Sequence, residues 1–303
     1  MDVNVLVVGG SGFVGSNLCV ELDEQGHDVT ALARSPEEAD LPGSVETVAG
    51  DVTDYESIEG TFEGQDAAIN LVALSPLFKP GGGNEMHDRV HRGGTEHCVQ
   101  AAEEHGVDRF VQMSALGADR NGPTHYIRSK GRAEEVVRDS SLSWVIVRPS
   151  IVFGDDCEFV KFTKKLKRMF APGVPLYPLP GGGTQTRFQP IWIGDFAPML
   201  VEMLTGEDHG GQTYEIGGPE VITLREVAES VFAAENRSIT IVGLPMPLAG
   251  VGLKTLGVLP VFPMGADQYR SLNFDNTVEK NDIGEFGVSE DELTTFDEYL
   301  GLA

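Results

Sequence analysis

The sequence predicts an α/β protein built on a doubly wound parallel sheet, with a smaller C-terminal substrate-binding region. The chain opens with an apolar run, residues 3–8, that passes through a glycine-rich turn into an amphipathic helix ending near Gln25. Strand-like and helical segments then alternate as far as Pro149, which is typical of parallel sheets with crossover helices. Beyond Pro149 this alternation stops, and proline and glycine crowd residues 171–183.

The first half of the chain contains strand-like segments in which apolar and β-branched residues concentrate. We expect strands at 3–8, 27–34, 45–49, 67–72, 109–113 and 144–148, and helices at 88–105 and 126–140. Right-handed crossovers would bring the carboxyl ends of these strands to one edge of the sheet, where such folds bind their ligands.

The second half of the chain is less regular. We interpret 171–183 as a loop, and we expect a strand at 213–216, a helix at 223–234 and an irregular final sixty residues. The sequence therefore predicts a nucleotide-binding domain over 1–155 and a smaller substrate- or partner-facing region over 156–303. Some segments of that region should return to pack on the sheet.

The charge of the chain limits its partners. Among 303 residues, 47 are acidic and 22 basic, giving a formal net charge of −25, and only 8 of the basic residues are lysines. This balance argues against a nucleic-acid partner, because phosphate contacts need Lys and Arg. The spread of the acidity resembles that of proteins from salt-in halophiles, and the alternative is an ordinary acidic cytosolic protein. The halophilic interpretation predicts stability that depends on salt screening.

Cysteines, histidines and apolar segments suggest a reducing, cytoplasmic location. Cys19, Cys98 and Cys157 lie far apart and the sequence contains no HExxH motif, so we expect neither a disulfide framework nor a metal site. The apolar segment 239–264 is a poor transmembrane span because Lys254 and four prolines interrupt it. We also expect no signal peptide. The protein would be cytoplasmic and at most peripheral to the inner face of the cell membrane.

The glycine-rich turn after the first strand predicts a dinucleotide site. Gly10, Gly12 and Gly15 follow the spacing G-x-G-x-x-G between a strand and a helix. The first glycine allows a tight turn, the second lets backbone approach a pyrophosphate, and the third lets helix and strand pack closely. The helix N-terminus would supply N–H groups and a favourable dipole for phosphate. The alternative is a tight turn that binds nothing.

The residues after the second and third strands bear on the choice of cofactor. The second strand ends in Ala33, Arg34 and Ser35, without the carboxylate that would hydrogen-bond an unmodified ribose. A guanidinium can hold a 2′-phosphate, so we predict that NADP(H) is preferred over NAD(H). Asp51 is placed to accept from the adenine amino group, and a helix N-cap is an equally good interpretation.

A tyrosine and a lysine in the second half of the nucleotide domain predict proton transfer. Tyr126 and Lys130 are four residues apart, so on a helix they share one face. An ammonium beside a phenol favours the phenolate, and such a tyrosine can exchange a proton with a carbonyl or hydroxyl group. Ser114 ends an earlier strand, and its hydroxyl could hold the same substrate oxygen.

Together these motifs resemble the short-chain dehydrogenase/reductase superfamily in its extended and atypical branches. The resemblance rests on GGSGFVG (9–15), GDVTD (50–54), NLVA (70–73), 93–115, YIRSK (126–130), VRPSIVFG (147–154) and QPIWIGDFA (189–197). The string GADQYRSLNFDNTV (265–278) narrows it to the branch containing the nucleotide-binding accessory subunit of respiratory complex I and its stand-alone prokaryotic relatives.

The resemblance implies a Rossmann core, a pyrophosphate held at Gly9, Gly12 and Gly15, and proton transfer by Ser114, Tyr126 and Lys130. The residues expected to contact the cofactor are Gly9, Gly10, Ser11, Gly12, Phe13, Val14, Gly15, Arg34, Ser35, Asp51, Val52, Leu71, Val72, Ala73, Tyr126, Lys130, Pro149 and Ile151. One departure limits this transfer. His91 stands where many extended members have Asn in a VNxxGT motif, so that part of the site is not carried over.

Three functions remain open at this stage. The first is an NADP(H)-dependent oxidoreductase acting on a carbonyl or hydroxyl substrate that the sequence does not identify. The second is a non-catalytic subunit or redox sensor that holds NADPH in a respiratory, complex I-like assembly. The third is a nucleotide-sugar epimerase or dehydratase. Turnover separates the first from the second, because Tyr126→Phe should abolish activity and leave partner binding intact.

A local reversal of charge follows the nucleotide domain. Residues 158–170 form a basic amphipathic pattern, and no acidic residue occurs from Phe159 to Gly194. The pattern is compatible with a docked helix whose basic face is solvated, with an anionic-substrate site, or with a partner or anionic membrane surface. Lys165, Arg168 and Arg187 are therefore candidate substrate or partner contacts, although a structural ion pair is at least as good an interpretation for Arg187.

Overall fold

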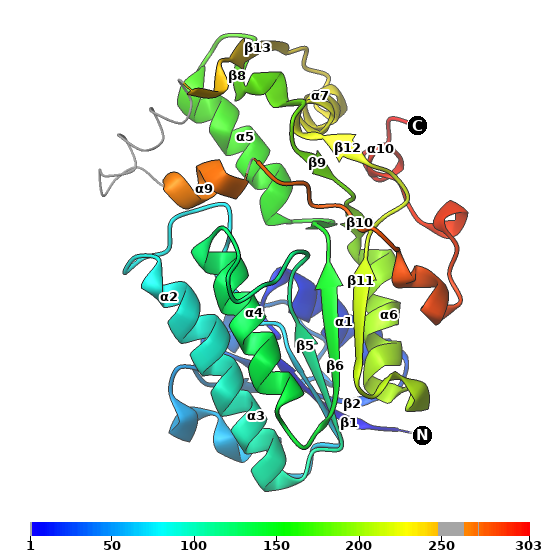
Figure 1. Cartoon of the computed structure of the whole chain (residues 1–303). Coiled ribbons are helices and arrows are strands. Elements are labelled where there is room, and N and C mark those ends of the chain that lie inside the picture. Colours follow the sequence, from blue (N-terminus) through cyan, green and yellow to red (C-terminus); the bar gives the residue numbers. More distant parts are fainter. Residues whose placement is uncertain (1, 248–263, 272) are drawn as a thin grey trace. The chain divides into compact units, whose positions relative to one another are not determined.

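The central sheet has seven strands in the order β11-β6-β5-β4-β1-β2-β3 (Figure 1). The computed structural model describes residues 2–247, 264–271 and 273–303. The strands are β1 (Asn4–Val8), β2 (Asp28–Ala33), β3 (Glu46–Ala49), β4 (Ala67–Asn70), β5 (Arg109–Met113), β6 (Ser143–Pro149) and β11 (Gln212–Ile216). The pairs among β1 to β6 are all parallel. The predicted doubly wound α/β class is confirmed.

The strand order places the expected ligand edge beside β1. The chain runs from β1 through β2 to β3 on one side, then crosses to β4 on the other side of β1. In open parallel sheets, ligands bind beyond the carboxyl ends of the strands at such a reversal of strand order. Residues Val5 to Val8 have no exposed surface, which explains why β1 is an uninterrupted apolar run.

Helices cover both faces of the sheet (Figure 1). Helices α1 (Phe13–Glu24) and α6 (Ile193–Thr205) lie on one face, and α3 (Gly94–His105) and α4 (His125–Arg138) on the other. Side chains of β1, β4 and β5 pack with α3 in a core that includes Leu6, Ile58, Phe62, Val99 and Phe110.

One helix departs from the expected 3.6-residue period. Helix α2 (Glu85–His87) continues through a π-helical segment, η4 (Asp88–Gly93), directly into α3. The sequence predicted a regular helix over 88–105. A π-helical turn uses i→i+5 hydrogen bonds and often occurs at functional sites. In this protein it carries His91.

The chain divides into two compact units. The first contains 1–74, 80–149 and 193–215, and the second contains 75–79, 150–192 and 216–303. The second unit holds α5 (Glu158–Phe170), α7 (Leu224–Ala234), α9 (Ala266–Ser271) and α10 (Phe296–Tyr299). Its short strands are β7 (Val152–Phe153), β8 (Leu176–Pro180), β9 (Arg187–Phe188), β10 (Ile191–Trp192), β12 (Ile222–Thr223) and β13 (Thr240–Leu244).

The prediction that 171–183 forms only a loop is wrong. Strand β8 lies within it and pairs in parallel with β13. Tyr177 and Leu179 alternate inward with almost no exposed surface, so the segment gains a buried face despite its prolines. Proline is tolerated because a two-stranded sheet leaves each strand an edge whose N–H groups need no partner in the ladder.

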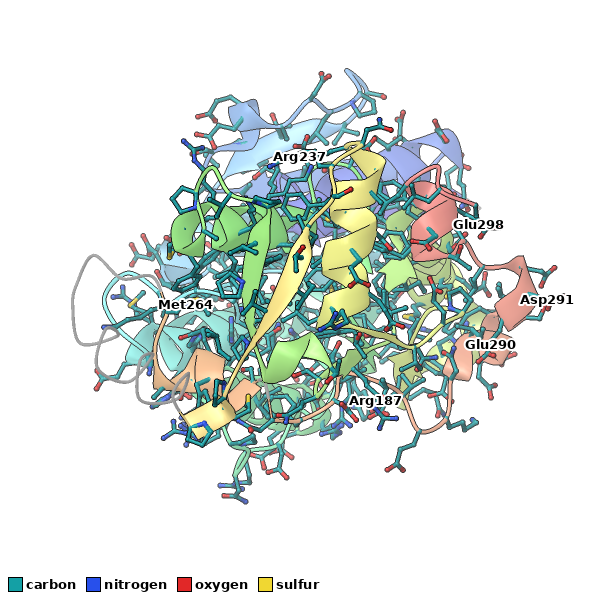
Figure 2. All side chains as sticks on the ribbon, turned by 90° about the horizontal axis from the view of Figure 1, so that it is seen from above. Arg187, Arg237, Met264, Glu290, Asp291 and Glu298 are labelled. Carbon is teal, nitrogen blue, oxygen red and sulfur yellow. The ribbon has the colours of Figure 1, made fainter. Side chains whose placement is uncertain are left out.

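Acidic side chains of the second unit lie at its surface. Glu290, Asp291 and Glu298 are exposed and point outward in Figure 2. Glu298 also accepts from the backbone N–H and hydroxyl of Thr295, which caps α10. Among the described residues no helix is long and apolar enough to cross a membrane. Most of the apolar segment 239–264, interpreted from its sequence as a poor transmembrane span, falls outside the described residues.

Candidate cofactor and proton-transfer site

The glycine-rich turn leaves no room for side chains at two of its glycines. A Cβ on Gly15 would collide with the carbonyl of Gly9, and one on Gly10 would lie 2.6 Å from the Cβ of Ala31 on β2. Gly9, with φ of +93°, adopts the left-handed conformation that the tight turn requires. The turn therefore depends on Gly9, while Gly10 and Gly15 permit close packing. The exposed Gly12 immediately precedes α1.

The remaining residues of the turn leave its backbone accessible. Ser11, Phe13 and Val14 are half-buried, and α1 has no side-chain N-cap. The first N–H groups of a helix have no intrahelical partner, so this end of α1 suits an anionic group. A cradle that excludes Cβ atoms beside an uncapped helix end fits a dinucleotide pyrophosphate.

The segment after β4 lies against this turn. The Leu71 N–H donates to the carbonyl of Val8 at 2.9 Å, which extends the β1–β4 pairing. A Cβ on Gly9 would lie 3.3 Å from Cγ2 of Val72. Ala73 is exposed, and the Leu74 N–H donates to Nε2 of His91 at 2.9 Å. The expected cofactor residues Leu71, Val72 and Ala73 thus border the glycine turn.

Two arginines, Arg34 after β2 and Arg89 in η4, act electrostatically on Asp51, which follows β3. Burial alone would raise the pKa of Asp51, but hydrogen bonds from the N–H and hydroxyl of Thr53 and the charges of Arg34 and Arg89 lower it overall. Both Thr53 bonds reach Oδ1 at 2.9 Å, so Asp51 closes a turn instead of capping a helix. Arg34 and Arg89 are exposed and have no ion pair within the described ranges.

Neighbouring residues fix the turn that contains Asp51. The carbonyl of the buried Val52 contacts Nδ1 of His97 at 2.8 Å. A Cβ on Gly94 would lie 2.7 Å from Cγ2 of Val52, so the helix carrying Arg89 packs tightly on the Asp51 turn. Ser35 is half-buried beside Arg34.

Lys130 is buried on α4 and bonded to the end of β5. Its side chain is 1% exposed, and Nζ donates to the carbonyl of Met113 at 2.9 Å. Burial lowers the pKa of Lys130 to about 8, although the negative charge of Glu134 partly opposes this. At neutral pH the ammonium is therefore largely charged but close to its titration range.

Tyr126 lies on the same face of α4 as Lys130, four residues earlier, and is half-buried. Its ring packs edge-on against His91, with centroids 5.3 Å apart, and against His87, with centroids 5.8 Å apart. Nδ1 of His91 lies 2.8 Å from Oγ of Ser129, which donates to the Tyr126 carbonyl at 2.8 Å. Two imidazoles thus flank the tyrosine that the sequence singled out.

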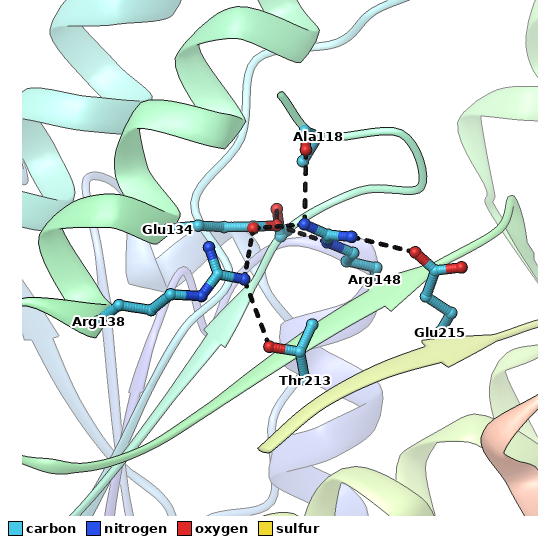
Figure 3. A network of polar contacts seen from close by, with 7 residues as sticks. Ala118, Glu134, Arg138, Arg148, Thr213 and Glu215 are labelled. Atoms are coloured by element: carbon cyan, nitrogen blue, oxygen red, sulfur yellow. Dashed lines mark hydrogen bonds and ion pairs between the residues drawn. The ribbon is translucent and has the colours of Figure 1, made fainter. Parts of the chain in front are cut away.

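Figure 3 shows a charge network around the buried Glu134, and Ser114 belongs to this network. The Ser114 hydroxyl donates to Oε1 of Glu134 at 2.5 Å. Glu134 is 1% exposed and also accepts from Arg148 at 2.7 Å and Arg138 at 2.9 Å. The hydrogen bonds from Arg148 to Glu134 and to Glu215 raise the pKa of the guanidinium. The network joins β5, α4, β6 and β11.

The other candidate residues lie at the end of β6 and in the second unit. Pro149 is buried at the end of β6, and the carbonyl of Ile151 accepts from the N–H of Ile191 at 2.9 Å. Arg187 forms an ion pair with Asp275, with Nη2 of Arg187 2.6 Å from Oδ2 of Asp275. This is the geometry of the structural alternative for Arg187.

Helix α5 has the predicted amphipathic arrangement. Phe159, Phe162 and Leu166 are buried, and Lys165 and Arg168 are exposed. Nζ of Lys165 lies 4.3 Å from the centre of the Phe78 ring, within the range of a cation–π contact. Arg168 has no ion pair with any residue that the structure describes.

Three residues of the site were missed or set aside by sequence reasoning. Glu134 lies four residues after Lys130, so the helical spacing that paired Tyr126 with Lys130 would also have found it. Arg89 carried no sequence signal, and His91 was noted only as a departure from a motif. Among the described residues no group of three His, Cys, Asp or Glu side chains could hold a metal ion.

Comparisons with known proteins point to the same cofactor. Residues 9–170 match a family described as NAD(P)H-binding. The mitochondrial NADH dehydrogenase [ubiquinone] 1 alpha subcomplex subunit 9 of Arabidopsis thaliana is 31% identical over 252 residues, 80% of this chain and 60% of that protein. The 40 kDa subunit of NADH-ubiquinone oxidoreductase of Neurospora crassa is 26% identical, covering 96% of this chain and 76% of that protein. An NAD(P)H azoreductase of Xenophilus azovorans is 25% identical, covering 84% of this chain and 82% of that protein.

Solved structures show the same fold. An epimerase of Methanothermobacter thermautotrophicus superposes with a TM-score of 0.73 at 18% identity, covering 99% of this chain and 90% of its own. UDP-glucose 4-epimerase of Thermus thermophilus, solved with NAD, has a TM-score of 0.65 at 20% identity, covering 89% of this chain and 98% of its own. At these identities the likeness concerns the fold alone.

The chain spans less than two thirds of its Arabidopsis relative, so that protein's partners and activity do not transfer directly. The family match, in contrast, covers more than half of the chain and includes the glycine turn, Tyr126 and Lys130. The chain therefore belongs to the NAD(P)H-binding family, with the extended short-chain dehydrogenase and epimerase fold and a resemblance to the complex I subunit.

Proposed function

We propose that this protein is an NADP(H)-dependent oxidoreductase of the atypical short-chain type, acting on a carbonyl or hydroxyl substrate. The observation that carries the proposal is the placement of Tyr126 and Lys130. They share a face of α4, and the buried ammonium is bonded to the carbonyl of Met113 at the end of β5. The glycine turn lies in the same compact unit.

The residues that would hold the cofactor are those of the glycine turn and the segment after β4. A bound nicotinamide would supply hydride transfer at its ring carbon. The N-terminus of α1 would hold the pyrophosphate, and Leu71 to Ala73 would border the dinucleotide. The Rossmann core, the match to an NAD(P)H-binding family and the Cβ-excluding turn support this assignment.

The proton would be exchanged through Tyr126. The ammonium of Lys130, with a pKa of about 8, would stabilise the phenolate that remains after proton transfer to a substrate oxygen. We assign the contact with that oxygen to Tyr126. The hydroxyl hydrogen of Ser114 is directed to Glu134, so Ser114 is the weaker candidate for orienting the substrate.

The preference for NADP(H) would depend on two arginines. Arg34 follows β2, where a 2′-phosphate would be expected, and Arg89 acts electrostatically on the same neighbour, Asp51. In a chain of net charge −25, two exposed arginines with no ion pair among the described residues favour an anionic ligand. Arg34→Asp should reverse the ratio of NADPH to NADH affinity, and an unchanged ratio would refute the assignment.

The test of activity begins with protein loaded with NADPH in multimolar KCl. Nicotinamide fluorescence is followed while quinones, aldehydes, ketones, azo compounds and nucleotide sugars are added in turn. Loss of the signal with one class, absent in Tyr126→Phe, would establish the oxidoreductase and name its substrate class. Signal that persists with every class would contradict the proposed activity.

A second candidate is a protein that holds NADPH without turnover in a respiratory, complex I-like assembly. Two observations favour it: the serine hydroxyl is engaged by Glu134, and one corner of the second unit exposes large apolar side chains. Those side chains are Phe170, Val174, Leu176, Val242 and Leu244. Lys165 and Arg168 on α5 belong to the same unit and would favour an anionic partner or a peripheral position at the inner membrane face.

A variant of the exposed apolar side chains distinguishes the two candidate functions. Leu176→Ser with Val242→Ser should leave turnover unchanged if the protein is a free-standing enzyme. The same double variant should lose co-sedimentation with membranes if the corner docks the protein there. Only the likeness in fold supports a nucleotide-sugar epimerase activity. The nucleotide sugars among the added substrates test that activity directly.

A further inference from the structure

His91 joins two segments that the proposed function requires. The Leu74 N–H donates to Nε2 at 2.9 Å, and Nδ1 lies 2.8 Å from the hydroxyl oxygen of Ser129. That hydroxyl donates in turn to the carbonyl of Tyr126 at 2.8 Å. The imidazole thus connects the segment after β4 with the backbone of the tyrosine, through bonds made by side chains that are 1–2% exposed.

These bonds determine the protonation state of the ring. A backbone N–H can only donate, so Nε2 of His91 must be the acceptor. The Ser129 hydroxyl has spent its one hydrogen on the Tyr126 carbonyl, so Nδ1 must carry the hydrogen that it shares with Ser129. In this series of hydrogen bonds, from Leu74 through His91 and Ser129 to Tyr126, each donor has an acceptor only when His91 is the neutral Nδ1–H tautomer.

The surroundings of the ring favour the same state. Burial lowers the pKa of His91 well below its ordinary value, and the charges of Lys130 and His87 add to this effect. The groups facing the ring are Lys130 and Tyr126 from α4 and His87 from α2. None of them is a carboxylate that would stabilise an imidazolium.

We propose that His91 is a positioning residue that holds the cofactor-facing segment after β4 in register with Tyr126. It does so because a neutral imidazole presents an acceptor and a donor on opposite sides of one rigid ring. His91 lies in the π-helical segment η4, a kind of turn that often occurs at functional sites. The inference rests on the proposed cofactor site, and it adds a residue that neither the glycine motif nor the Tyr–Lys pair contains.

Three variants test the proposal against a matched control. His91→Phe keeps an aromatic ring but removes both bonds, His91→Asn keeps a shorter donor and acceptor, and Ser129→Ala removes only one partner. The control is His105→Asn, which changes a histidine paired with Glu59 at the far end of α3. Each protein is measured for its NADPH dissociation constant, for NADPH-induced stabilisation and for turnover of any substrate found.

We expect His91→Phe to bind NADPH roughly tenfold more weakly than the wild type, as the loss of buried hydrogen bonds implies. His91→Asn should lie between the two, and His105→Asn should match the wild type. In acid, wild-type affinity should fall while the protein remains folded, because an imidazolium cannot accept from Leu74. His91→Asn should lack this acid limb. A merely structural role would lower the melting temperature without changing either readout.

A measurement on the apoprotein tests the tautomer separately. Long-range proton–nitrogen spectra of the imidazoles should show His91 as Nδ1–H at neutral pH, and an Nε2–H or doubly protonated ring would overturn the proposal. Equal NADPH affinity in His91→Phe and wild type would also overturn it. Failure of the wild type to bind NADPH would instead refute the proposed cofactor site.

Discussion

The hydroxyl of Ser114 donates to the carboxylate of Glu134, with 2.5 Å between Oγ and Oε1. Both residues are buried, at 3% and 1% exposure. A serine hydroxyl has a single hydrogen, so while this bond holds, Ser114 can only accept from another group. The serine that the motif singled out is therefore part of the buried network that supports α4.

The first prediction concerns Ser114→Ala. Removing the hydroxyl should destabilise the fold by about 1–2 kcal/mol, because Glu134 loses one donor but keeps Arg148 and Arg138. NADPH affinity should not change, and any turnover should fall by less than about tenfold. Unfolding curves and steady-state kinetics measure both effects. A loss of turnover comparable to that of Tyr126→Phe would return Ser114 to the catalytic set.

The second prediction concerns the carboxylate itself. Glu134→Gln should lower the free energy of unfolding by roughly 3 kcal/mol, because it removes the buried charge that Arg148 faces and, among the described residues, leaves Arg148 only its ion pair with the half-buried Glu215. The neighbouring Glu135→Gln is the control, since its ion pair with Arg120 is exposed and should contribute less than about 1 kcal/mol. Denaturant titration at constant salt separates the two. Equal effects would mean that the network does not stabilise α4.

The sequence predicted the secondary structure of the first half of the chain better than that of the second half. The inner strands of the central sheet are largely buried on both faces, so they stand out as apolar runs, and helical spacing alone put Tyr126 and Lys130 on one face. Strand β8 was missed because its prolines hide an alternating buried pattern. The pairing of β8 with β13 joins residues more than sixty positions apart, which no local pattern reports.

In the candidate site, too, the sequence predicted the local motifs but not the contacts that depend on the folded structure. Glycine spacing located the turn, but which glycine adopts a positive φ depends on contacts with β2 and β4. The partner of Ser114 depends on a rotamer, and the partner of Arg187 lies 88 residues away. The π-helical turn that contains His91 departs from the 3.6-residue period on which helix prediction rests.

The third prediction is a dependence on alkaline pH. The pKa of Lys130 is lowered from 10.5 in the unfolded chain to about 8 in the folded protein. Between these values the unfolded state binds more protons, so this residue makes stability rise with pH over that range. Turnover through Tyr126 should instead fall above pH 8, as the ammonium is lost. Lys130→Met should show neither dependence, and a wild-type rate that is flat to pH 10 would contradict the assignment.

The fourth prediction concerns Arg89, the second arginine that acts electrostatically on Asp51. Arg89→Ala should weaken NADPH binding by roughly tenfold and leave NADH binding almost unchanged, because only NADPH carries the 2′-phosphate. Arg92→Ala is a close control, since Arg92 lies on the same helix and is paired with Glu96 at 2.9 Å. Isothermal titration with both nucleotides gives the ratio. Equal losses for NADPH and NADH would assign Arg89 to the turn around Asp51 instead of to the phosphate.

The fifth prediction concerns salt. A net charge of −25 makes the folded chain repel itself, and ionic screening relieves that repulsion. The melting temperature should therefore rise steeply between 0.1 and 1 M KCl, where the Debye length falls from about 10 to 3 Å. Each kcal/mol of relieved repulsion would add roughly 1–2 °C in a chain of this size. Sucrose provides the control because it stabilises by exclusion without screening charge. A melting temperature that does not shift between low and multimolar KCl would rule out the halophilic interpretation, and the acidity would then be that of an ordinary cytosolic protein.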